Sequence, residues 1–139
     1  MKLIGIDYGR RRIGLAASDE TGTLVRGLAT IDRRKNTDCL AILHGIIAKE
    51  KPQGVVFGLP LDSDDRETPM SVEVRKFAAN LEKNLAIPVY YIDESLTSKQ
   101  AADLMLFRPK KDRRVKANID RVAACLILES FLRDMKCVH

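Results

Sequence analysis

The chain of 139 residues lacks a long hydrophobic run: no apolar stretch approaches the roughly 20 residues that a helix needs to cross a bilayer. It also lacks the basic head and apolar centre of a signal peptide, because the N-terminus runs straight into a strand-like segment. These two absences lead us to expect a cytoplasmic protein with no membrane partner.

Cysteine and histidine are scarce. The cysteines, Cys39, Cys125 and Cys137, stand far apart and form no C-x-x-C pair. His44 falls inside a helix-like stretch and His139 is the last residue. We therefore expect free thiols in a reducing compartment, and neither a zinc site nor a disulfide framework.

The remaining composition is that of one ordinary domain spanning residues 1–139, with 45% hydrophobic and 31% charged residues. The net charge of +5 favours an anionic partner. Positive charge gathers in three stretches, Arg10–Arg12, Arg33–Lys35 and Arg108–Lys116. Such clusters are typical of phosphate-backbone binding, although solvated loops carry them as often. The candidate nucleic-acid contacts are Arg10, Arg12, Lys110, Lys111, Arg113, Arg114 and Lys116.

Periodicity and turn residues predict a mixed α/β chain. Strands are expected at 2–7, 12–18, 23–31, 54–61 and 88–93. Helices are expected near 36–50, from 69 onward, at 98–107 and at 119–136, the last capped by Asn118, with the basic stretch 108–116 as a loop. The first three strands would pair antiparallel, and the last two would join through right-handed crossovers. This is the order of the ribonuclease H-like fold: a mixed five-stranded sheet with helices on both faces.

Asp7 closes the first predicted strand and is followed at once by Tyr8 and Gly9. An unpaired carboxylate at the end of a buried strand costs several kcal/mol, on the order of the penalty for a buried ion. Asp7 is therefore expected to meet a metal, a phosphate-bound cation or an arginine, for which the stretch Arg10–Arg12 offers candidates.

Other acidic residues can reach the same sheet edge. Asp93 and Glu94 end the last predicted strand, and because side chains alternate along a strand only one of them can face the site. Asp120 falls in the first turn of the last predicted helix, where the helix dipole alone would favour it. The buried stripe that follows, with Ala123 and Ala124, indicates that Asp120 faces inward.

Three carboxylates that converge without a matching lysine or arginine would repel one another. A hard divalent cation removes that repulsion, and carboxylate oxygens suit Mg²⁺ or Mn²⁺. Two ions held about 3.5–4 Å apart would clamp the attacking and leaving oxygens of a phosphodiester. Together with the basic stretches, this pattern indicates metal-dependent cleavage of nucleic acid.

The chain resembles the YqgF/RuvX family of bacterial ribonuclease H-like proteins. The resemblance covers essentially the whole chain. It rests on four motifs in order: Gly5–Gly9 with Arg12–Ala16 and Ser18-Asp19; Gly58–Leu61; Asp93–Thr97; and Asp120 with Ala123-Ala124 and Ile127–Glu129. Three positions depart from the family pattern. Arg10 replaces a small hydroxyl residue, Asp65 replaces a loop glycine, and Ser95 replaces an arginine.

The resemblance implies a divalent-metal nuclease with catalytic, metal-binding carboxylates at Asp7, Glu94 and Asp120. It also implies action at the 5′ end of precursor 16S ribosomal RNA, on the RNA itself or on a ribosomal particle. Two alternatives remain open: a Holliday junction resolvase acting on branched DNA, and a non-catalytic nucleic-acid-binding protein of ribosome assembly or transcription. A resolvase needs two active sites and hence a dimer, so the expected state is a monomer or a weak homodimer.

Overall fold

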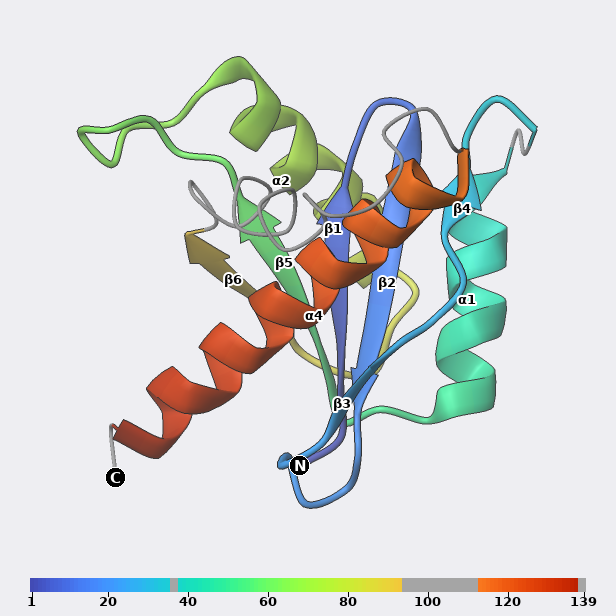
Figure 1. Cartoon of the computed structure of the whole chain (residues 1–139), viewed down its shortest axis with the longest axis vertical. Coiled ribbons are helices and arrows are strands. Elements are labelled where there is room, and N and C mark those ends of the chain that lie inside the picture. Colours follow the sequence, from blue (N-terminus) through green and yellow to red (C-terminus); the bar gives the residue numbers. More distant parts are fainter. Residues whose placement is uncertain (36–37, 94–112, 138–139) are drawn as a thin grey trace.

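The computed structural model describes residues 1–35, 38–93 and 113–137, with side chains up to residue 135 and excluding those of 113–119. One mixed sheet forms its centre (Figure 1). The strands are β1 (Leu3–Tyr8), β2 (Arg12–Ser18), β3 (Val25–Gly27), β4 (Ile31–Asp32), β5 (Gly54–Leu59) and β6 (Val89–Asp93). The helices are α1 (Cys39–Glu50), α2 (Pro69–Glu82) and α4 (Arg113–Cys137).

The sheet has the order β3-β2-β1-β5-β6, with β4 also paired to β2. The antiparallel pairing of β1 with β2 and the parallel pairing of β1 with β5 and of β5 with β6 agree with the prediction. Strand β5 is buried along its whole length, as a strand covered on both faces must be. The carboxyl ends of β1, β5 and β6 therefore share one edge.

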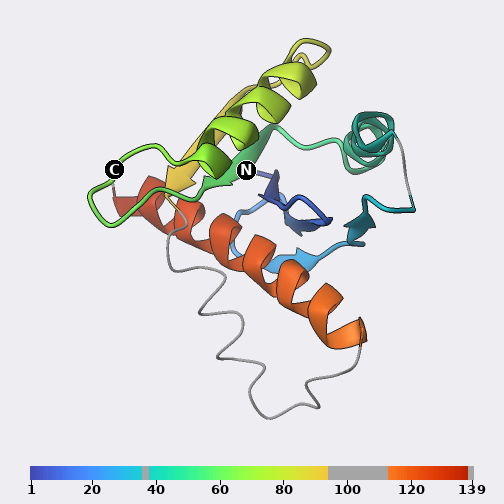
Figure 2. The ribbon, with the colours of Figure 1, turned by 90° about the horizontal axis from the view of Figure 1, so that it is seen from above.

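Helices cover both faces of the sheet, with α1 and α2 on one side and α4 crossing the other (Figure 2). Alternate residues of β1 show the division, because Ile4 and Ile6 pack toward α1 and α2, whereas Leu3 packs toward α4. Among the described residues, we find no helix with the length and hydrophobicity of a membrane span.

The predicted third strand, 23–31, is two strands. Strand β2 pairs Ala16 with Gly27 of β3 and Ile13 with Ile31 of β4. Between these two pairs, two residues of β2 face the three residues 28–30. The extra residue interrupts the ladder as a bulge does, so the sheet has six strands where five were expected.

Two helix boundaries also differ from the prediction. Helix α1 begins at Cys39 because the side chain of Asp38 caps it by accepting a hydrogen bond from the Ala41 N–H. Helix α4 begins at Arg113, so Asn118 lies inside it and 113–116 is helical where a loop was predicted. The predicted helix 98–107 lies outside the described residues.

Candidate nuclease site

Asp7 lies near the end of β1 on the face that α4 covers. Two residues earlier in the strand, a Cβ atom on Gly5 would lie 2.9 Å from the carbonyl oxygen of Ala124 and 3.0 Å from Cβ of Leu128. Side chains two apart on a strand share a face. The half-buried side chain of Asp7 therefore points toward α4.

Gly14 brings Asp120 to the same place. It is the antiparallel partner of Asp7, and opposed Cα atoms in such pairs are about 4.5–5.5 Å apart with their side chains on one face. A Cβ atom on Gly14 would overlap the backbone carbonyl of Asp120. The absence of a side chain at Gly14 thus lets α4 lie directly on β2, with Asp120 beside Asp7.

Arg12 is the arginine that meets a predicted catalytic carboxylate. Its Nε donates to Oδ2 of Asp120 over 2.6 Å, and the two side chains are 23% and 22% exposed. Arg12 lies two residues before Gly14 and so shares the α4 face. Among the described residues, Arg12 therefore places a fixed positive charge beside Asp120.

Arg10 points elsewhere. Its Nε donates to Oε2 of Glu73 on α2 over 3.0 Å, and the Tyr8 hydroxyl donates to Oε1 of the same carboxylate over 2.9 Å. The hydrogen bond from Arg10, followed by that from Tyr8, lowers the pKa of Glu73. Burial raises the pKa of Tyr8, which keeps its hydroxyl protonated as a donor. Arg10 thus belongs to the α2 face, away from Asp7 and Asp120.

Asp93 is on the opposite face from Asp7 and Asp120. It pairs in register with Leu59 of β5, which packs in the core beneath α1 and α2, and parallel partners share a face. Asp93, the first of the two acidic residues that end the last predicted strand, therefore does not point toward α4. Glu94, Lys110 and Lys111 lie outside the described residues, and Arg113, Arg114 and Lys116 are described only by their helical backbone in α4.

Known proteins match the chain over nearly its full length. Residues 1–134 match the model of the family described as "RuvX: Holliday junction resolvase". The chain belongs to the RuvX family. A relative from Synechococcus elongatus is 37% identical over 133 residues, covering 96% of this chain and 89% of the relative. One from Oleidesulfovibrio alaskensis is 39% identical over 132 residues, covering 95% and 92%. Both are named "Putative pre-16S rRNA nuclease".

Solved structures confirm the predicted ribonuclease H-like fold of this RuvX-family chain. The Thermus thermophilus RuvC structure with a Holliday junction substrate aligns with a TM-score of 0.60 at 19% identity, covering 97% of this chain and 96% of RuvC. The fowlpox virus resolvase with Holliday junction DNA also gives 0.60, at 15% identity, covering 97% and 99%. At these identities the likeness concerns the fold.

The described carboxylates suit a hard cation. Asp7 and Asp120 offer oxygen donors of the kind that Mg²⁺ and Mn²⁺ prefer, on one face of one sheet edge. Within the described residues no group of three or more metal-ligating side chains is close enough to hold an ion, and the third predicted ligand, Glu94, lies outside them. The donor chemistry of Asp7 and Asp120 fits a divalent cation, and Arg12 lies beside Asp120.

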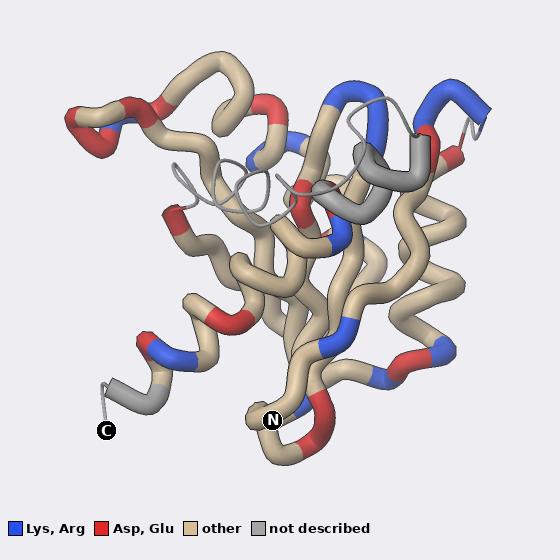
Figure 3. Tube along the Cα trace, in the orientation of Figure 1, with Lys and Arg blue, Asp and Glu red and all other residues tan. Residues whose placement is uncertain are grey.

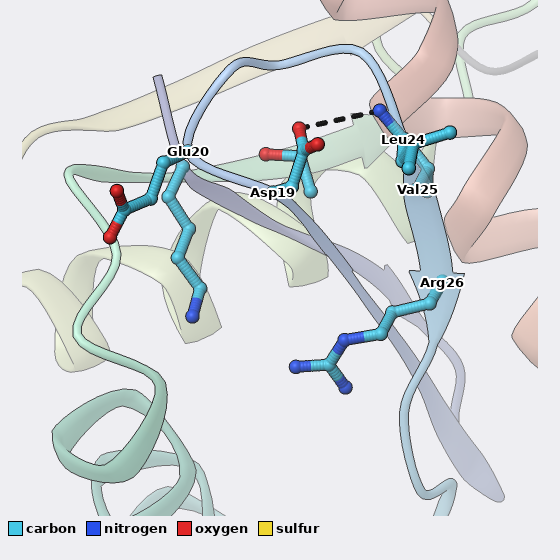
Figure 4. Close-up of a pocket in the computed structure, with 7 residues that line it drawn as sticks. Asp19, Glu20, Leu24, Val25 and Arg26 are labelled. Atoms are coloured by element: carbon cyan, nitrogen blue, oxygen red, sulfur yellow. Dashed lines mark hydrogen bonds between the residues drawn. The ribbon is translucent and has the colours of Figure 1, made fainter.

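A hollow of about 570 Å³ lies at the other end of the sheet, where Lys2 precedes β1 and Ser18 ends β2 (Figure 4). Asp19, which lines it, accepts hydrogen bonds from the Thr21 hydroxyl and from the backbone N–H groups of Thr23 and Leu24. Those contacts lower the pKa of Asp19, the Thr21 contact most. Asp19 therefore stabilises a turn, and the hollow is separate from the Asp7 site.

The sequence analysis missed two residues that make contacts near this sheet edge, Glu73 and Arg33. Glu73 gave no signal, because an isolated glutamate on a helix is ordinary. Arg33 belonged to a visible basic stretch, but its position beside the β1–β2 turn depends on the pairing of β4 with β2.

Proposed function

We propose that this RuvX-family protein is a divalent-metal-dependent nuclease that processes the 5′ end of precursor 16S ribosomal RNA, with Asp7, Glu94 and Asp120 as its metal-binding catalytic carboxylates. The observation that carries the proposal is the approach of Asp120 to Asp7 across Gly14. The fold likeness to two resolvases and the names of the relatives support the reaction class.

The chain's own residues would act as follows. Asp7 and Asp120, with Glu94, would hold one or two Mg²⁺ or Mn²⁺ ions, which when bound would stabilise charge on the attacking and leaving oxygens of the phosphodiester. Arg12 orients Asp120 through their 2.6 Å contact. It also keeps that carboxylate neutralised before a cation arrives. Lys110, Lys111, Arg113, Arg114 and Lys116 would hold the nucleic-acid backbone.

Cleavage of labelled precursor 16S rRNA in Mg²⁺ or Mn²⁺ tests this assignment. We expect Asp7→Asn, Glu94→Gln and Asp120→Asn each to lose at least a hundredfold in rate, because each removes a charged ligand. Asp93→Asn is the matched control, since it changes a neighbouring carboxylate that points to the other face. Equal cleavage by wild type and Asp7→Asn would rule out the triad.

The family description favours a second candidate, resolution of Holliday junctions. The same assay with a synthetic four-way DNA junction distinguishes the two, provided that the oligomeric state is measured alongside, because a resolvase needs paired sites. Preferred cleavage of the junction by a dimer would favour the resolvase. Binding of either substrate with no metal-dependent cleavage by wild type would favour a non-catalytic assembly protein.

A further inference from the structure

Two basic segments that are separate in the sequence form one surface. Strand β4 pairs with the start of β2, placing Asp32 opposite Arg12. The backbone N–H of Arg33 then donates to the carbonyl of Arg11 over 2.9 Å. The segment Arg33–Lys35 is thereby fixed beside the turn that carries Arg10–Arg12. Both appear as blue stretches at the same end of the molecule (Figure 3).

The side chain of Arg33 connects its own segment to the β1–β2 turn. Its Nη1 donates to the carbonyl oxygen of Gly9 over 3.0 Å, and its guanidinium carbon lies 4.9 Å from the centre of the Tyr8 ring. A half-buried guanidinium held by a carbonyl and an aromatic face is ordered before any ligand binds. The surface is therefore preformed and not assembled by the ligand.

Three positive charges on this surface are available to a ligand. Arg11, Arg34 and Lys35 are exposed, and in the described part of the chain their side chains form no ion pair. Neighbouring Arg10 and Arg12 are engaged by Glu73 and Asp120. The surface lies next to Arg12, which borders the Asp7–Asp120 site, and extends away from that site through Arg11.

We infer that Arg11, Arg34 and Lys35 form a phosphate-binding surface for the nucleic-acid strand that runs past the Asp7–Asp120 site. The inference rests on the proposed function for the identity of the ligand. Exposed cations held next to a site that cuts phosphodiesters suit consecutive backbone phosphates. A membrane is disfavoured, because none of the large exposed hydrophobic side chains among the described residues lies in either segment.

Salt-dependent binding tests the surface. Anisotropy titrations of labelled single-stranded RNA from the 5′ end of precursor 16S rRNA are run at several KCl concentrations. All proteins carry Asp7→Asn, so that the RNA stays intact. Removing one cation that binds a phosphate reduces the slope of log K against log salt by about 0.7 on a single strand. We expect Arg11→Gln/Arg34→Gln/Lys35→Gln to reduce the slope by about 2.

The control variant removes the same charge elsewhere. Lys49, Lys51 and Lys83 are exposed, and Lys49 and Lys51 lie at the far end of α1. Lys49→Gln/Lys51→Gln/Lys83→Gln should change the slope by less than 1. If the first triple variant does not fold, the single exposed change Lys35→Glu takes its place and should weaken binding more than Lys49→Glu.

Equal slopes for the two triple variants would overturn the inference, since net charge alone would then govern binding. Cleavage by the protein with its natural Asp7 is measured in parallel, which separates this result from the proposed function. Cleavage together with equal slopes overturns the surface alone. No cleavage together with the expected slope difference overturns the nuclease and leaves the surface standing.

Discussion

Arg12 and Asp120 make the ion pair that defines the site before any metal binds. A carboxylate that faces a sheet edge with a cation 2.6 Å away is already compensated, so the apo protein can keep Asp120 half-buried. The same cation would oppose a divalent ion at that carboxylate. Arg12 would therefore both stabilise the metal-free site and compete with a metal at the proposed centre.

Arg12→Gln should separate these two effects. Without metal, we expect the free energy of unfolding to fall by about 1 kcal/mol, since the variant cannot form this partly exposed ion pair. The increase of Tm produced by Mg²⁺ should be larger in Arg12→Gln than in wild type, because the competing charge is gone. Thermal denaturation with and without Mg²⁺ measures both.

Arg26→Gln is the control for Arg12→Gln. Arg26 pairs with Glu50 over 2.6 Å, on the sheet face opposite α4, so the variant removes an ion pair away from the site. An equal Mg²⁺-dependent Tm increase in wild type and Arg12→Gln would contradict the competition.

Asp65 shows why a departure from the family glycine is tolerated. It has φ of 58°, in the left-handed region that glycine adopts freely and that aspartate enters more easily than most residues. The loop is held by Asp62, whose side chain accepts from the N–H groups of Asp64 and Arg66. The aspartate therefore keeps the backbone shape that the family pattern implies.

Substitutions at Asp65 should follow from that conformation. Asp65→Gly should leave the free energy of unfolding unchanged or raise it by up to about 1 kcal/mol, whereas Asp65→Val should lower it by about 1–2 kcal/mol. Ser63→Val, an exposed change in the same loop, should be close to neutral. Urea denaturation measures all three, and a decrease in Asp65→Val no greater than in Ser63→Val would refute the account.

At the scale of elements, the packing of α4 on β1 and β2 builds the site. Gly5 and Gly14 let the helix backbone approach the sheet, and the small Ala123 and Ala124 complete the contact. The sequence predicted the buried alanine stripe and the inward position of Asp120 from helical spacing. The role of Gly14 could not be predicted, because it depends on which strand lies beneath the helix.

Gly14→Ala should push α4 off β2. The added methyl would overlap the Asp120 carbonyl, so we expect a decrease of about 1–3 kcal/mol in the free energy of unfolding, as for an overpacked core. Gly45→Ala is the matched control, since a Cβ there meets nothing within 4 Å in an exposed helix position, and should stabilise by about 0.5–1 kcal/mol. Equal stability of Gly14→Ala and wild type in urea would contradict this packing.

The sequence predicted the ends of helices and strands least well. The segment 23–31 was predicted as one strand, and only the register with β2 reveals the extra residue at 28–30. Helix α4 starts earlier than predicted because residues 113–118 contain no helix breaker, so Asn118 does not act as a cap. The parallel pairing of β1 with β5 was predictable, since the burial of β5 on both faces was clear from its apolar run.

At the scale of the whole molecule, the first strand of the chain and the beginning of its last helix meet at one sheet edge. Asp7 comes from the first strand and Asp120 from the last helix, on a fold shared with Holliday junction resolvases. The β1–β2 turn and the segment after β4 add positive charge at that edge. The fold thus supports the proposal of a carboxylate centre beside a surface that suits phosphate.

Calorimetric titration with Mn²⁺ tests the central claim most directly, because it measures whether Asp7 and Asp120 hold a common metal without requiring the correct substrate. We predict that wild type and Asp93→Asn bind Mn²⁺ with the same affinity. Asp7→Asn and Asp120→Asn should each bind at least tenfold more weakly, because each loses a ligand. Wild-type affinity in both Asp7→Asn and Asp120→Asn would contradict the claim that these carboxylates hold a common metal.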